Sequence, residues 1–138
     1  MISQRLALWA IAYGLLIWFE ATVIVRWFGG YVLVPGNSAL TIAVFVLTVP
    51  LVFAIGWVFF ATFQTKPLER ALVTILICAA GLIADAFVFV WIENVFPIMS
   101  ATQERIFASW LLWAYGLGLL SGVWPARLPR VPAAVGDK

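Results

Sequence analysis

The sequence contains no histidine among its 138 residues. This absence excludes His-ligated haem, His-ligated chlorophyll and the metal sites that depend on imidazole. It also excludes nucleophilic pairs of the Ser–His or Cys–His type. Cys78 is the single cysteine, so no intramolecular disulfide can form. We therefore expect no catalytic residues, no metal site and no enzyme activity.

Charged residues are also scarce. They make up 10% of the chain, and the net charge is only +2. Proteins that bind nucleic acids carry basic side chains clustered on one face or along one helix. No such cluster is present here, so we expect no nucleic-acid partner.

Apolar residues, in contrast, are abundant, at 65% of the sequence. Soluble domains contain about 45–50%. A soluble chain of this length has too little interior to bury so much apolar surface. The composition therefore predicts an integral membrane protein whose first partner is the lipid bilayer.

Four apolar segments are long enough to cross the ~30 Å hydrocarbon core of a bilayer. The first ends in Trp18, Phe19 and Glu20 rather than in a small-residue cleavage site, so we expect it to remain as a helix. The segments predict an all-α, antiparallel four-helix transmembrane bundle over residues 1–124. A flexible tail with proline and arginine follows at 125–138. The expected helices are about 6–28, 39–63, 71–92 and 106–124.

Short signals mark the connections between these segments. Gly29 and Gly30 are expected to end the first helix, and the PGN sequence at 35–37 to turn the chain into the second. Ser100 and Gln103 have the spacing of a capping box before the last helix.

The distribution of positive charge predicts the orientation. Cytoplasmic loops of membrane proteins carry an excess of lysine and arginine. Both termini and the 64–70 loop fall on the richer side, so we expect them in the cytoplasm and the protein in the cytoplasmic (inner) membrane. The basic residues on that side are Arg5, Lys66, Arg70, Arg127, Arg130 and Lys138, and those on the other side are Arg26 and Arg105.

Two acidic residues lie inside the expected membrane segments at matching positions. Glu20 follows Leu6, the start of the first segment, by 14 residues, and Asp85 follows Ala71, the start of the third, by the same number. These two helices run in the same direction, so both acids should lie about 21 Å from that end. Carboxylates at this depth are costly and face a protein interior or water.

The two acids allow two interpretations. They form a proton or cation site in which neighbouring carboxylates share one proton, or each is a structural polar group satisfied by a neighbour. Thr48 and Tyr115 fall near the same level and are candidate hydrogen-bond partners.

The last helix carries small residues at four-residue spacing. Ala114, Gly118 and Gly122 form a small-xxx-small ladder, which allows another helix to approach closely. This ladder either packs inside the bundle or forms an interface with a second copy or another subunit.

The final hairpin resembles a known group of proteins. The sequences ENVFP at 93–97 and ASWLLWAYG at 108–116 are similar to an uncharacterised family of small bacterial four-helix membrane proteins. This resemblance implies a fold and a bacterial membrane but no activity. A looser similarity of outline, with a carboxylate in the first helix and a small-residue ladder in the fourth, connects the chain to small multidrug-resistance transporters.

Together these features favour a small polytopic membrane protein that acts as an accessory or assembly subunit of a larger membrane complex. The alternative is a small proton-coupled transporter that works as a homodimer through its membrane-embedded carboxylates. We expect other membrane helices as partners and no cofactor, with bound lipid as a candidate ligand.

Overall fold

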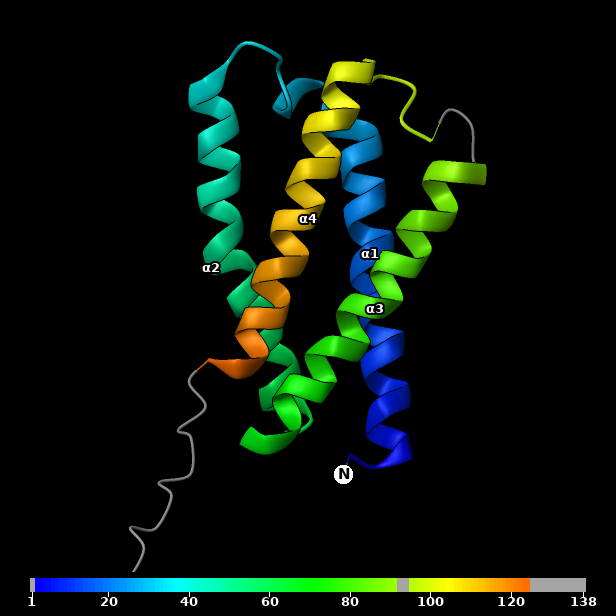
Figure 1. Ribbon diagram of the computed structural model, residues 1–138, viewed down its shortest axis with the longest axis vertical. Coiled ribbons are helices and arrows are strands. Elements are labelled where there is room, and N and C mark those ends of the chain that lie inside the picture. Colours follow the sequence, from blue (N-terminus) through cyan, green and yellow to red (C-terminus); the bar gives the residue numbers. More distant parts are fainter. Residues whose placement is uncertain (1, 92–94, 125–138) are drawn as a thin grey trace, which may run out of the picture.

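The computed structural model describes residues 2–91 and 95–124 (Figure 1). Its described residues form four helices, each long and apolar enough to cross a membrane. Consecutive helices run in opposite directions (Figure 1). The predicted all-α, four-helix membrane fold is therefore confirmed, whereas the predicted tail at 125–138 lies outside the described residues. The helices are α1 (Gln4–Val32), α2 (Ser38–Thr62), α3 (Pro67–Trp91) and α4 (Ala101–Val123).

Side-chain caps explain where the helices begin. Asn37 accepts a hydrogen bond from the Leu40 amide at 3.1 Å and starts α2. Ser100 and Gln103 form both bonds of a capping box, so α4 begins at Ala101, before its apolar run. Gly36 has a φ of 82°, which explains the glycine in the turn between α1 and α2.

The expectation that Gly29 and Gly30 end the first helix is wrong, because α1 continues through both to Val32. Their missing side chains make room for the connection between α3 and α4. A Cβ atom at Gly30 would lie 2.7 Å from the Ile98 carbonyl oxygen. The Gln103 side-chain amide also donates to the Gly30 carbonyl at 2.8 Å. The glycines therefore serve close packing at this end of the bundle.

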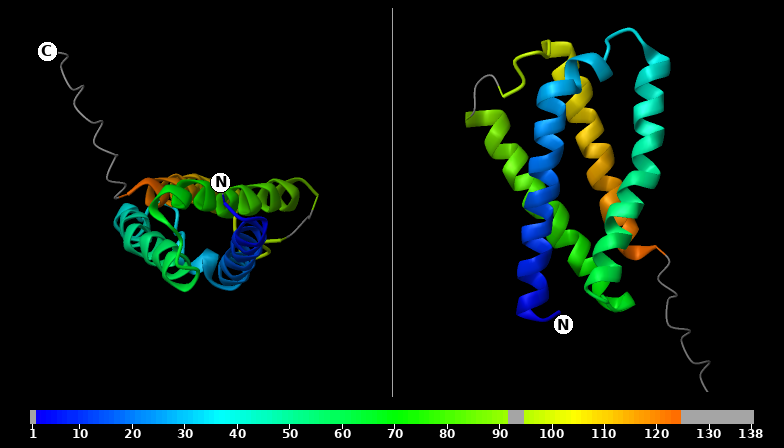
Figure 2. Two further views of the ribbon diagram at one scale, coloured as in Figure 1. Left: turned by 90° about the horizontal axis from the view of Figure 1, so that it is seen from below. Right: turned by 180° about the vertical axis from the view of Figure 1, so that it is seen from behind.

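The order of the helices around the bundle differs from their order in the chain. α1 packs most extensively on α3, α3 packs on α4, and α4 packs on α2. α1 and α2 follow one another in sequence but make few contacts. Seen along its length, the bundle places α3 and α4 side by side, with α1 and α2 separated from each other (Figure 2). One side of the bundle is therefore not closed by helix packing.

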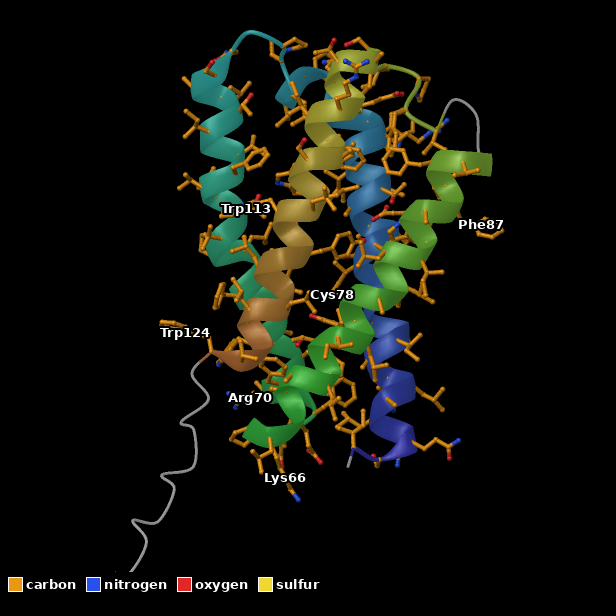
Figure 3. The ribbon with its side chains drawn as sticks, viewed as in Figure 1. Lys66, Arg70, Cys78, Phe87, Trp113 and Trp124 are labelled. Carbon is orange, nitrogen blue, oxygen red and sulfur yellow. The ribbon has the colours of Figure 1, made fainter. Side chains whose placement is uncertain are left out.

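Two apolar cores lie towards opposite ends of the bundle. Near the end that carries the N-terminus, Ala10, Phe59, Phe60 and Val73 are buried together. Towards the other end, the buried cluster contains Leu33, Phe96 and Phe107. Phe87 and Trp124 point away from the bundle, where lipid would surround them (Figure 3). The middle of the bundle, between the two cores, holds its most polar features.

Candidate functional site

Asp85 is the acidic side chain that the structure places in the interior. It lies on α3 and is only 9% exposed. The Trp18 indole N–H donates a hydrogen bond to Oδ1 at 2.8 Å, and the Tyr115 hydroxyl donates one to Oδ2 at 2.5 Å. Both oxygens of the carboxyl group are therefore held by donors from two other helices, α1 and α4.

A glycine on α3 makes this arrangement sterically possible. Gly81 lies one helical turn before Asp85, and a Cβ atom at this position would lie 2.6 Å from the Tyr115 hydroxyl oxygen. The phenol ring therefore passes over the surface of α3 where α3 has no side chain. This close approach allows Tyr115 to reach the carboxyl group from α4.

The carboxyl group lines a cavity of about 170 Å³ to which all four helices contribute residues. Of the described residues that line it, Asp85 alone carries a formal charge. The walls are mostly aliphatic and aromatic. The polar side chains around them belong to Tyr13, Trp18, Thr22, Thr48, Thr74, Cys78, Trp110, Tyr115 and Ser121. A buried carboxyl group with aromatic walls is suited to a positively charged or protonated ligand group.

The cavity faces the side of the bundle where α1 and α2 make few contacts. Its wall on α1 includes Tyr13 and Ile17, and its wall on α2 includes Leu51 and Ile55. The Tyr13 hydroxyl donates to the Ile55 carbonyl at 3.1 Å and bridges the two helices towards the N-terminal end. Beyond this bridge few contacts join α1 and α2, whereas α1 packs on α3, α3 on α4 and α4 on α2.

Thr48 also lines the cavity but does not bind Asp85. Its hydroxyl donates to the Val44 carbonyl at 2.7 Å and accepts a hydrogen bond from the Trp110 indole at 2.6 Å. Trp113 similarly donates to the Phe45 carbonyl at 3.1 Å and lies between α2 and α4 (Figure 3). Thr48 therefore belongs to the contact between α2 and α4. Of the two candidate partners, Tyr115 is the one that reaches the acid.

Glu20 lies elsewhere. It follows Trp18 by two residues, so it shares the depth of Asp85, but its side chain is exposed and does not line the cavity. The structure therefore does not bring the two acids together, and Asp85 is the acid that lines the cavity.

The small-residue ladder of α4 faces α3. A Cβ atom at Gly118 would lie 2.8 Å from the Cys78 sulfur, and one at Gly122 would lie 3.0 Å from the Arg70 carbonyl oxygen. Ala114 lines the cavity one turn further along. Figure 3 shows Cys78 on α3 in the middle of the bundle, beside α4. In this structure the ladder thus serves packing between α3 and α4.

Trp18 was missed by the sequence analysis, although a signal for it existed. It follows Leu6 by 12 residues, so the calculation that placed Glu20 at the level of Asp85 also applies to it. An indole buried in a membrane protein needs an acceptor for its N–H. Gly81 could also have been suspected, because it lies one turn from Asp85 on the same face of the helix.

The described residues contain no group of three or more cysteine or acidic side chains with the spacing of a metal site. What the cavity offers is one carboxyl group, two hydrogen-bond donors that hold it, and aromatic faces. These groups are suited to binding a monovalent organic cation or a proton.

The fold and this buried site define the class: a multi-pass, four-helix membrane protein with a carboxyl group inside its bundle. Residues 32–128 match the sequence profile of a family described as "Family of unknown function (DUF5367)", and the chain belongs to that family. The matched region contains Asp85 and Tyr115, whereas Trp18 precedes it. Neither the curated proteins nor the solved structures contain a match to this chain.

Proposed function

We propose that this chain is a small proton-coupled transporter, in which Asp85 binds a proton and a positively charged substrate in turn. The observation that carries the proposal is the single carboxyl group, 9% exposed, in the wall of a mostly apolar cavity. A cation that displaces one proton there leaves the net charge of the site unchanged. Each passage of one monovalent substrate would therefore move one proton in the opposite direction.

The hydrogen bonds around Asp85 supply a coupling between occupancy and helix arrangement. Trp18 and Tyr115 donate to the carboxyl group from α1 and α4. A substrate cation would compete with these donors for the same oxygen atoms. Binding would then loosen the contacts that tie α1 and α4 to α3, which is the kind of two-state link that transport requires.

The test is uptake of phenyltrimethylammonium into proteoliposomes that carry an imposed proton gradient. Asp85→Asn should reduce uptake to the level of protein-free liposomes, while its amide can still accept from Trp18 and donate to Tyr115. Glu104→Gln is the matched control, because Glu104 is an exposed acid in the first turn of α4 and should leave uptake unchanged. Uptake by Asp85→Asn equal to that of the native protein would overturn the proposal, and a change in thermal stability alone would make Asp85 a structural residue.

A second candidate function is favoured by one observation at Glu20. Its side chain is exposed and lies near the depth of Asp85 on α1. A carboxylate at the centre of a membrane helix costs about 2.5–3.5 kcal/mol when it faces hydrocarbon. A polar group of another protein would remove this cost, as expected for an accessory subunit of a larger complex. Native mass spectrometry of the particle extracted in mild detergent tests this: a hetero-complex that dissociates in Glu20→Leu supports it, and an unchanged single chain contradicts it.

The similarity of outline to small multidrug-resistance transporters adds little to either candidate. In this chain the small-residue ladder of α4 packs against α3. A homodimer through Gly118 and Gly122 would therefore need a different packing of the bundle. The transporter proposal therefore rests on Asp85 rather than on a dimer.

We also propose that the bundle lies in the cytoplasmic membrane of a bacterium, with both termini in the cytoplasm. The asymmetry of basic residues supports this orientation. Attaching a reporter enzyme that is active on only one side of the membrane to each terminus tests it. Signals from opposite sides for the two termini would contradict it.

A further inference from the structure

A second cavity of about 150 Å³ lies next to the aspartate cavity, which is the 170 Å³ space beside Asp85. We name it the apolar cavity, because apart from the Trp110 indole no polar side chain lines it. It lies between α1 and α2, with two side chains of α4 as its floor. Its lining consists of Ile24, Val25, Phe28, Gly29, Val32, Leu33, Val44, Phe107 and Trp110.

The two cavities adjoin. Phe107 and Trp110 line both of them, so one pair of rings forms the floor from one cavity to the next. Trp110 is fixed there by its hydrogen bond to Thr48 at 2.6 Å, and Phe107 is 2% exposed. We call the two adjoining cavities together the groove.

The groove is long along the bundle axis. Ile24 and Val32 follow Trp18 by 6 and 14 residues, so the apolar cavity spans from about 9 to 21 Å beyond the level of Trp18. A dry cavity of about 150 Å³ accommodates one benzene molecule.

Charge distinguishes the two parts. The aspartate cavity has one acidic group, and the apolar cavity has no polar side chain apart from the Trp110 indole, whose N–H is already bonded. An occupant that fills both parts therefore has a positive charge at one end and hydrocarbon at the other. It also reaches the groove from the bilayer, because the groove faces lipid between α1 and α2.

We infer that the substrate is an elongated, lipid-soluble organic cation, which enters between α1 and α2 with its ammonium group at Asp85 and its hydrocarbon part in the apolar cavity. This inference rests on the proposed transport function, since it specifies the substrate of that same site. A compact cation fills only the aspartate cavity, whereas an elongated one needs both.

The experiment compares two probes in the proteoliposome assay, the compact phenyltrimethylammonium and the elongated decyltrimethylammonium. Val44→Phe places a ring in the apolar cavity from α2. We expect it to lower Asp85-dependent uptake of the decyl probe by about tenfold or more, the effect of excluding a chain at a cost of about 1.4 kcal/mol. Uptake of the phenyl probe should stay within about twofold of native.

Val46→Phe is the matched control, because Val46 lies on the same helix, is 60% exposed and lines neither cavity. It should transport both probes like the native protein. If Val44→Phe fails to fold, judged by helical circular dichroism, Val32→Phe fills the same cavity from α1 at a position that is 38% exposed.

The outcomes separate the two proposals. Unchanged decyl uptake in a folded Val44→Phe or Val32→Phe protein would show that the apolar cavity holds a lipid chain or nothing, which overturns the inference and leaves the transport function standing. Uptake of both probes that does not depend on Asp85 would overturn the transport function itself. Selective loss of the decyl probe supports both.

Discussion

α1 packs closely along α3 but makes only a few contacts with α2. Towards α3 it presents Gly14, where a Cβ atom would clash with the Ile77 carbonyl oxygen. Towards α2 it presents Tyr13, whose hydroxyl bonds to the Ile55 carbonyl and whose ring packs 5.1 Å from that of Phe59. The first contact is backbone against backbone along the helix, and the second is a side-chain bridge near one end.

The difference between these two contacts shows how a membrane protein can be tightly packed on one side and loosely packed on another. Helices in lipid gain little from the hydrophobic effect, so close backbone approach and hydrogen bonds determine which contacts hold. The interface of α1 with α3 has both, including the bond from Trp18 to Asp85. The contact of α1 with α2 has one bond and leaves a groove. Substrate entry is expected on the side where packing is weakest.

The largest loss of stability should follow from disrupting the tight contact between α1 and α3. Gly14→Ala places a methyl group against the Ile77 backbone, which has no flexible atom to move. We expect a loss of unfolding free energy of up to about 3 kcal/mol, the upper end for overpacked interiors. SDS-induced unfolding followed by circular dichroism measures it. Gly116→Ala is the control, since a Cβ atom there meets nothing within 4 Å, and it should be neutral or slightly stabilising. Equal effects at both positions would contradict the tight α1–α3 contact.

A smaller effect is expected at Gly81. Gly81→Ala displaces the Tyr115 hydroxyl from Asp85, and a hydrogen bond between membrane helices is worth up to about 1.7 kcal/mol. The displaced group is the tip of a side chain, so part of this loss is recovered by movement of the ring. We expect a loss of about 1 kcal/mol in the same unfolding assay.

A double variant sharpens this second prediction. In Tyr115→Phe the hydroxyl that meets the added methyl group is absent, so Gly81→Ala should cost much less in that background. Additive losses would show that the alanine acts on something other than the Tyr115 hydroxyl.

The smallest loss of stability should come from disrupting the contact between α1 and α2. Tyr13→Phe removes the bond to the Ile55 carbonyl but keeps the ring against Phe59. Hydrogen bonds between membrane helices average about 0.6 kcal/mol, so we expect a loss of about that size. Tyr31→Phe, at a position that is 75% exposed, serves as the control and should be neutral. A loss from Tyr13→Phe as large as that from Gly14→Ala would mean that α2 is held as firmly as α3.

Much of the fold could be predicted from the sequence, because apolar length and helical rise depend on local properties. The apolar runs gave the four helices, and counting from their starts placed Asp85 and Tyr115 near one level. The helix ends were less predictable. α1 continues past Gly29 because the chain around Ile98 packs against it, and that contact comes from a distant part of the sequence.

The site was predicted only in part for a similar reason. Counting residues gives the depth of a side chain but not the direction in which it points within the bundle. Glu20 and Trp18 share a level, yet Trp18 faces α3 and Glu20 does not. That difference depends on which helices are neighbours. The packing of α1 on α3 instead of on α2 cannot be predicted from the sequence of any single segment.

The packing order also has a consequence for biosynthesis. Trp18 and Asp85 are separated by 67 positions, so the ribosome completes α1 and α2 long before the acceptor for the indole has been translated. We therefore expect the first hairpin to enter the membrane as two helices with few mutual contacts. We expect α1 to gain its main packing partner only when α3 inserts against it, so that the third span, rather than the first pair, commits the chain to its final arrangement.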